Sequence, residues 1–224
     1  MIIWVNGAFG SGKTHTTHEL MRRIPNSYVY DPEEVGFFIR DNIPSKLKLS
    51  DFQDFPMWRE FNYKMLEYIG REHDGIVIVP MTITDKAYFD EVIGKLKRKG
   101  INIKHFSLLA SKETLLKRLK KRGDGRDSWA AQQIERCINS LSDDLFEEHI
   151  ITDSMTIDEV VEHIAAACGI DLVPDNRNWM MRKVDRFRYG VSTLDYLSDI
   201  LYFFRQKRML TKWFLGIYNK PHRN

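Results

Sequence analysis

The residues best suited to chemistry in this chain lie near its start, in a glycine-rich turn. Residues 7–14 fit the pattern G-x-x-x-x-G-K-[ST], in which backbone N–H groups of the turn surround phosphate oxygens. In this pattern Lys13 reaches the β- and γ-phosphates as a point charge, and the hydroxyl of Thr14 is a ligand for Mg²⁺. The pattern therefore predicts binding of ATP or GTP together with Mg²⁺. The residues predicted to hold the nucleotide are Gly7, Ala8, Phe9, Gly10, Ser11, Gly12, Lys13 and Thr14.

The second candidate is a carboxylate, Asp31, which follows a short β-rich run at 27–30. Ligands of open α/β sheets lie beyond the carboxyl ends of the strands, so we expect Asp31 to face the glycine-rich turn. A carboxylate there acts as general base for an acceptor hydroxyl or holds Mg²⁺ through water. Alternatively, Asp31 only caps the helix that begins with Pro32, Glu33 and Glu34. Both interpretations stay open at this point.

Arginines form the third group of candidates. Arg118 and Arg122 are four residues apart and share one helix face, and Arg126 and Arg136 follow them in the chain. Phosphoryl transfer depends on positioning and on positive charge at the transferring group. We therefore predict that the glycine-hinged loop 123–129 is a lid that brings Arg118, Arg122 and Arg126 to the phosphates, and that Arg118 also contacts the nucleotide. The alternative is a solvated basic face that interacts favourably with the helix dipole.

The elements that must position these residues alternate along the chain. Strands are predicted at 2–5, 27–30, 75–80, 103–109 and 148–153, with helices between them. This alternation predicts an α/β fold of the P-loop kinase-like class, in which a five-stranded parallel sheet carries helices on both faces. We expect this domain to span residues 1–176.

An insertion at 33–74 interrupts the alternation with helices broken by prolines, and segments of this kind usually cover an acceptor substrate. Its polar candidates for substrate binding are Arg40, Arg59 and Asn62. The end of the third strand carries no acid, although ATPases often place a metal-holding acid there. That observation weighs against an ATPase motor and makes Asp31 the candidate for the acid that holds the metal ion. The remaining substrate-binding candidates are Asp31, Thr82 and Arg136.

The last part of the chain, residues 177–224, differs in charge from the rest. It has a net charge of +8 and ten aromatic residues, whereas the whole chain has a net charge of +3. This pattern predicts that residues 178–218 form a basic amphipathic segment that binds an anionic membrane surface. Packing on the domain or on a second copy, as a homodimer, is the alternative. Nucleic acid is not expected as a partner, because no recognition module accompanies the charge.

The two cysteines and the N-terminal residues indicate the cellular compartment. Cys137 and Cys168 lack metal-like or redox-like spacing, and the first strand begins at once, which leaves no room for a signal peptide. We expect a cytoplasmic protein, either free or peripheral on the inner face of the membrane.

Together these stretches resemble the tunicamycin-resistance proteins, small ATP-binding proteins of the nucleoside- and nucleotide-kinase-like branch of the P-loop fold. The resemblance covers residues 1–176 and is carried by 2–14, 28–33, 78–82 and 110–119. It implies that Arg118 and Arg122 match lid-helix arginines that small-molecule kinases use against the nucleotide base and phosphates. It also implies that Asp31 matches the acid after the second strand, and that the tail attaches to a membrane.

The family is associated with resistance to tunicamycin, a uridine-containing, fatty-acylated sugar antibiotic. The resemblance therefore implies a kinase-like resistance protein in which Lys13 and Thr14 hold MgATP and Asp31 activates an acceptor hydroxyl. Sequestration of the drug without chemistry is an alternative from a different functional class. A housekeeping nucleoside or small-metabolite kinase is the third reading.

Overall fold

The computed structural model describes residues 1–125, 127–146, 148–178, 180–182 and 184–185. The chain divides into two compact units, Met1–Asn176 and Arg177–Asn224. Of the second unit only residues 177, 178, 180–182 and 184–185 are described, and they include an ion pair of 2.6 Å between Arg177 and Asp185. The predicted membrane-binding segment 178–218 lies almost wholly outside the described residues. Within the described residues, no helix combines the length and apolarity that crossing a bilayer requires.

Five parallel strands form the sheet of the first unit, as predicted. Their order across the sheet is β2-β3-β1-β4-β5. The strands are β1 (Ile2–Gly7), β2 (Ser27–Val29), β3 (Ile76–Pro80), β4 (Ile103–Leu109) and β5 (His149–Ile151). The central strand β1 is buried along its whole length, because both of its neighbours and both covering layers exclude water from it. Its carboxyl end is therefore a fixed platform for the residues that follow.

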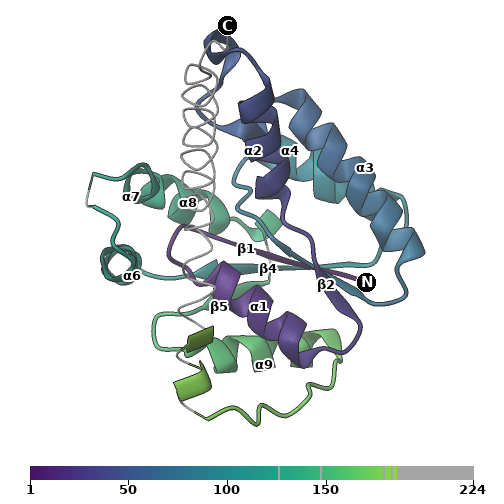
Figure 1. Cartoon of the computed structure of the whole chain (residues 1–224), viewed down its shortest axis with the longest axis vertical. Coiled ribbons are helices and arrows are strands. Elements are labelled where there is room, and N and C mark those ends of the chain that lie inside the picture. The colour runs from purple at the N-terminus through teal and green to yellow at the C-terminus, as the bar shows by residue number, and fades with distance from the viewer. Residues whose placement is uncertain (126, 147, 179, 183, 186–224) are drawn as a thin grey trace, which may run out of the picture. The chain divides into compact units, whose positions relative to one another are not determined.

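Helices cover both faces of this sheet, which confirms the predicted fold class. Figure 1 shows α1 (Lys13–Arg23) and α9 (Ile157–Cys168) on one side, and α3 (Pro56–Glu72) and α4 (Lys86–Phe89) on the other. Alternate residues of β1 serve the two layers: Ile3 and Val5 pack with α1 and α9, whereas Ile2 and Trp4 face α3 and its neighbours. A capping box between Thr156 and Glu159 begins α9.

The remaining helices follow the predicted outline. The insertion contains α2 (Pro32–Asn42), two single 3₁₀ turns, η1 (Ser45–Leu47) and η2 (Phe52–Asp54), and then α3. After α4 the same helical stretch continues as a π-turn, η3 (Asp90–Gly94), and as α5 (Lys95–Arg98). The elements after β4 are α6 (Lys112–Arg122), α7 (Trp129–Gln132), α8 (Ile134–Leu141) and the 3₁₀ turn η4 (Asp144–Phe146).

Candidate active site

The glycine-rich turn joins the end of β1 to the start of α1. Two of its glycines have backbone angles that favour glycine, with φ of 81° at Gly10 and 102° at Gly12. A Cβ on Gly7 would lie 2.5 Å from Oγ of Ser11, so the turn closes on itself at this point. No side chain among the described residues caps α1. The turn and the uncapped helix start thus present backbone N–H groups and the positive end of the helix dipole, the ordinary site for phosphate.

Lys13 begins α1 and folds back over the turn. Its Nζ donates to the carbonyl oxygens of Gly7 at 2.9 Å and Ala8 at 3.2 Å, and lies 5.6 Å from the centre of the Phe9 ring. Burial lowers the pKa of its ammonium group, and the carboxylate of Glu33 opposes that change. Thr14, the predicted Mg²⁺ ligand, is exposed in the first turn of α1, so its hydroxyl is open to an ion.

A buried polar network under the turn holds it to the sheet. The side-chain oxygen of Asn6 accepts from the N–H groups of Gly7 at 2.8 Å and Ile83 at 3.1 Å, and its Nδ2 donates to the carbonyl oxygen of Ile83 at 2.8 Å. Thr82 donates its hydroxyl to the carbonyl oxygen of Gly7 at 2.7 Å and is 5% exposed. The structure therefore places Thr82 beneath the turn, where it stabilises the loop, and its predicted contact with substrate stays a prediction.

Asp31 stands between β2 and α2 and caps the helix. Its Oδ1 accepts from the backbone N–H of Glu33 at 2.9 Å, and Pro32 occupies the first helical position. Burial and the neighbouring carboxylate of Glu33 raise the pKa of Asp31 to about 7, while Lys13 acts in the opposite direction. A carboxyl group with a pKa near neutrality is suited to accept a proton. The cap and the chemical role are therefore compatible in one side chain.

Glu33 is an acid that the sequence interpretation missed. Burial raises the pKa of Glu33, and the positive charges of Lys13 and Arg122 lower it. Glu33 therefore lies near Lys13 and Asp31, in the region beyond the carboxyl ends of the strands where open α/β sheets have their ligand crevice. The alternation of acids in Asp31-Pro32-Glu33 was the available signal, because the second position of a helix lies beside its cap.

The lid-helix arginines lie at the other side of the turn. Arg118 donates to the carbonyl oxygen of Thr152 at 2.6 Å, to the hydroxyl of Thr152 at 3.2 Å and to the carbonyl oxygen of Ser11 at 3.4 Å. It thereby links α6 to the glycine-rich turn and to the end of β5. Arg122 donates to Asp124 at 2.6 Å, while its charge acts on Lys13 and Glu33. Arg126 lies outside the described residues.

The predicted lid contacts the glycine-rich turn through an aromatic pair. Trp129, at the start of α7, has its ring 5.1 Å from that of Phe9 in an edge-on arrangement, and it is 48% exposed. Such pairs stabilise a contact by about 0.5–1.5 kcal/mol beyond the area they bury. The segment after α6 is therefore connected directly to the loop that faces the phosphates.

The three polar candidates of the insertion differ in their surroundings. Arg59 is 9% exposed, donates to Glu91 at 2.8 Å and to the carbonyl oxygen of Gln53 at 2.6 Å, and lies 4.2 Å from the centre of the Tyr88 ring. Asn62 is fully buried, accepts from the Tyr30 hydroxyl at 2.7 Å and donates to the carbonyl oxygen of Trp58 at 2.8 Å. These bonds stabilise the insertion itself.

Arg40 and Arg136 are the more accessible of the arginines predicted to bind substrate. Arg40 is half-buried in α2, and no hydrogen bond of its side chain occurs within the part of the chain that the structure describes. Arg136 is 49% exposed on α8 and lies 3.7 Å from Asp51. Substrate binding by Arg40, Arg59, Asn62 and Arg136 stays a prediction.

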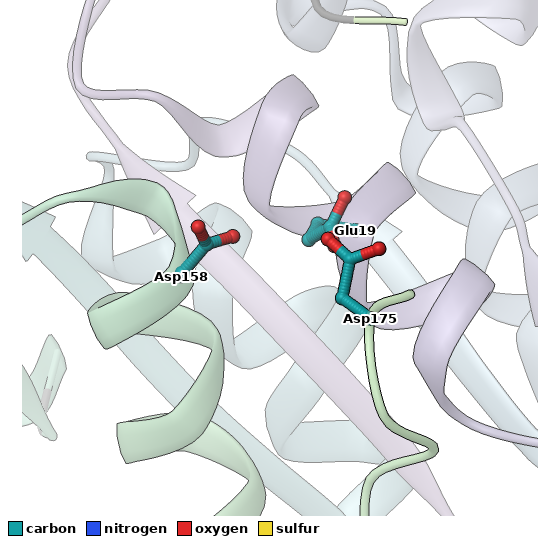
Figure 2. A group of neighbouring side chains, drawn as sticks. All are labelled: Glu19, Asp158 and Asp175. Carbon is teal, nitrogen blue, oxygen red and sulfur yellow. The ribbon is translucent and has the colours of Figure 1, made fainter. Parts of the chain in front are cut away.

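Three further carboxylates gather away from this crevice, on the α1 and α9 side of the sheet. Figure 2 shows Glu19, Asp158 and Asp175 with their oxygens turned toward one another, and one oxygen from each lies within 4.8 Å of the others. Arg22 forms ion pairs with Glu19 and, at 3.2 Å, with Asp175. The arginine balances part of the negative charge, and we assign the group no metal.

Comparisons with known proteins show which family and which structures the chain resembles. Residues 2–143 match the family model described as AAA domain. The structure of the Deinococcus radiodurans tunicamycin resistance protein is similar, with 38% sequence identity over 78% of this chain and 98% of that chain and a TM-score of 0.68. No curated protein matches the chain in sequence.

Two more distant structures share the fold. A sugar kinase from Janibacter sp. HTCC2649 is 18% identical over 75% of this chain and 94% of its own, with a TM-score of 0.54. A gluconokinase from Sinorhizobium meliloti 1021 is 17% identical over 75% of this chain and 90% of its own, with a TM-score of 0.53. At these identities the likeness shows a P-loop kinase-like fold and does not extend to a substrate.

Proposed function

The chain belongs to the AAA domain family and to the P-loop kinase-like family of the Deinococcus radiodurans tunicamycin resistance protein, and from this premise we propose that it transfers a phosphoryl group from ATP to a hydroxyl of tunicamycin. A fold of this kind binds nucleotides; the drug as acceptor and the chemical step are our proposal. The observation that supports it is Asp31 at the start of α2: its carboxyl group caps that helix, has its pKa raised to about 7 chiefly by burial, and interacts electrostatically with Lys13.

The residues present fit MgATP. The uncapped start of α1, the backbone of the glycine-rich turn and Lys13 suit the triphosphate. The exposed hydroxyl of Thr14 suits a Mg²⁺ ion, as do the carboxyl groups of Asp31 and Glu33, whose pKa values are raised chiefly by burial, an effect that a nearby cation would oppose. Mg²⁺, when bound, neutralises charge on the β- and γ-phosphates.

In the proposed step, Asp31 accepts the proton of an acceptor hydroxyl while the oxygen of that hydroxyl bonds to the γ-phosphorus of ATP. The bond between that phosphorus and the bridging oxygen breaks, and ADP leaves. Lys13 and Arg122 stabilise the charge on the transferring group, and so does Arg126 if the lid brings it near. Arg118 is already linked to Ser11 and Thr152, which suits it to hold the nucleotide.

A second candidate function is ATP-dependent binding of the drug without chemistry. It is favoured by the hydrogen bond from the Glu33 N–H to Asp31, because capping of the helix is enough to explain a carboxylate at this position without a role in catalysis. Mass spectrometry of tunicamycin after incubation with the protein, ATP and Mg²⁺ separates the two. We expect the drug to gain one phosphate, and none with Lys13→Ala. Unchanged drug that still binds supports sequestration, and absence of binding points to another small-molecule acceptor.

Replacement of Arg118 by Met tests the proposed nucleotide contact. We expect ATP affinity to fall about tenfold to a hundredfold, since one charge-assisted interaction contributes roughly 1.5–3 kcal/mol. Lys117→Met is the matched control, because Lys117 is exposed on the same helix. Isothermal titration calorimetry gives the affinities. Equal ATP affinity of Arg118→Met and the control would remove Arg118 from the nucleotide site.

Membrane attachment by residues 178–218 is a separate proposal that rests on the sequence, since the tail carries a net charge of +8. Each basic residue near an anionic surface contributes about 1 kcal/mol, so binding should weaken with salt. Vesicle co-sedimentation of the full chain is expected to require anionic lipid. The double variant Lys207→Glu with Arg208→Glu should bind anionic vesicles more weakly than the native protein. The double variant Lys120→Glu with Lys121→Glu on α6, which changes the charge equally, is the control and should bind them as the native protein does. Sedimentation that ignores lipid charge would exclude this attachment.

A further inference from the structure

An ion pair joins the insertion to the helix that follows the lid. Asp51 lies directly before η2, and its Oδ2 is 3.7 Å from Nη2 of Arg136 on α8. The Asp51 side chain is 16% exposed and that of Arg136 is 49% exposed. Because these two elements are far apart in sequence, the pair is a direct tie between the two segments.

Asp51 stands on a well-fixed base. Its other carboxylate oxygen accepts from the backbone N–H of Gln53 at 3.0 Å, and the carbonyl oxygen of Gln53 accepts from Arg59 at 2.6 Å. One residue further, Asp54 accepts from the Tyr88 hydroxyl at 3.0 Å. The carboxylate of Asp51 is therefore held in place by its own turn and by α3 and α4.

Aromatic packing adds to this base. The ring of Phe52 lies 5.6 Å from that of Trp58 and 6.1 Å from that of Phe37. A Cβ on Gly36 would lie 2.5 Å from the Phe52 ring, so α2 packs closely on η2 at this point. Asp31 caps α2 and Glu33 lies in its first turn, so η2 packs on the same helix that positions these two acids.

The other end of the pair is equally firm. Helix α8 is anchored by Ile134, Cys137 and Leu141, all fully buried. Asp51 also interacts electrostatically with Glu33 on α2 and with Cys137 on α8. Its ion pair with Arg136 therefore restricts the directions that the arginine side chain can take.

We propose that Asp51 is a positioning residue whose ion pair with Arg136 orients the arginine toward the acceptor and ties the insertion to α8. The acceptor part of this inference rests on the proposed function. An exposed ion pair contributes little to global stability, so the effect should appear in acceptor affinity and local opening, and hardly in thermal unfolding.

The test uses charge removal with the turn preserved. Asp51→Asn keeps the capping oxygen, since Asn and Asp cap equally well, and Arg136→Gln removes the partner charge. In the full-length protein we expect either change to raise the KM for tunicamycin about tenfold, with kcat and ATP affinity unchanged. The double variant should be no worse than the worse single variant, because each change breaks the same pair. Glu135→Gln, which removes an exposed acid paired with Lys112 on the same helix, is the control.

Hydrogen exchange gives a readout that does not need the proposed reaction. We expect the Gln53 N–H and the first turn of α8 to exchange faster in both single variants than in the native protein and in Glu135→Gln. Unaltered exchange, or additive effects in the double variant, would overturn the ion-pair inference. If the native protein neither binds nor modifies tunicamycin but the exchange pattern appears, the proposed function fails and the tie between insertion and α8 stands.

Discussion

Lys13→Ala is expected to abolish nucleotide binding while the fold persists. The ammonium group donates to Gly7 and Ala8, and these two bonds pass to phosphate oxygens when a triphosphate occupies the turn. Losing charge-assisted contacts of this kind costs at least about 3 kcal/mol, which is roughly a hundredfold in affinity. Isothermal titration calorimetry with ATP measures the loss, and thermal unfolding checks the fold.

The fold should persist because Lys13 is only partly buried and belongs to neither apolar cluster, so its truncation leaves no cavity in the core. Its charge is also partly desolvated, as the lowered pKa shows, so its removal relieves a small cost. Lys97→Ala is the matched control, an exposed lysine on α5. ATP affinity equal in the two variants would contradict the nucleotide site.

Asp31→Asn is expected to lower turnover about 10²-fold to 10⁴-fold with ATP affinity retained, the range that a general base contributes. Asn keeps the helix cap, so the change isolates the proton-accepting role. In the native protein the rate should rise with pH through about 7, because only the ionised carboxylate accepts the proton. Steady-state kinetics between pH 5 and 9 measure both effects. Turnover unchanged by the substitution would leave Asp31 as a cap.

The same substitution should stabilise the nucleotide-free protein at high pH. The folded-state pKa of Asp31 is raised from 3.8 to about 7, so the native state holds a proton that the unfolded state has lost between these values. The free energy of unfolding therefore falls as pH rises from about 4 to 7 and is constant above that range. We expect Asp31→Asn to be more stable than the native protein by about 2 kcal/mol at pH 8, less than the full pKa difference implies because solvent reaches part of the carboxyl group.

Urea unfolding at pH 5 and pH 8 checks this linkage. The control is Asp85→Asn, because Asp85 also caps a helix, α4, but is exposed. Asp85→Asn should show no such gain on going from pH 5 to pH 8. A stability difference for Asp31→Asn that does not grow over this range would exclude a folded-state pKa near 7 for Asp31.

The sequence predicts the sheet and the nucleotide loop well because their signals are local. The run at 2–5, the three glycines and Lys13 determine a strand, a turn and a helix start within a few residues, and the structure confirms all three. The buried run at 75–80 likewise requires a strand covered on both faces.

The candidate site is less predictable because its polar residues are sorted by tertiary contacts. The sequence near Arg59 does not reveal that its side chain bonds to Glu91, and the sequence near Asn62 does not reveal its hydrogen bond from Tyr30. Asn6 and Asp51 were missed for the same reason, since their partners Ile83 and Arg136 are remote in the chain. Burial of an arginine or an asparagine depends on which helix packs over it. The periodicity of apolar residues shows only which face of its own helix is buried.

Transfer of labelled phosphate tests the central claim most directly. The native protein is incubated with tunicamycin, Mg²⁺ and ATP labelled at the γ-phosphate, and the label on the drug is compared with the ADP formed. We predict that label appears on the drug in the same molar amount as ADP, that Lys13→Ala abolishes both products and that Asp31→Asn slows both. Drug that remains unlabelled while it is bound in an ATP-dependent manner would contradict phosphoryl transfer.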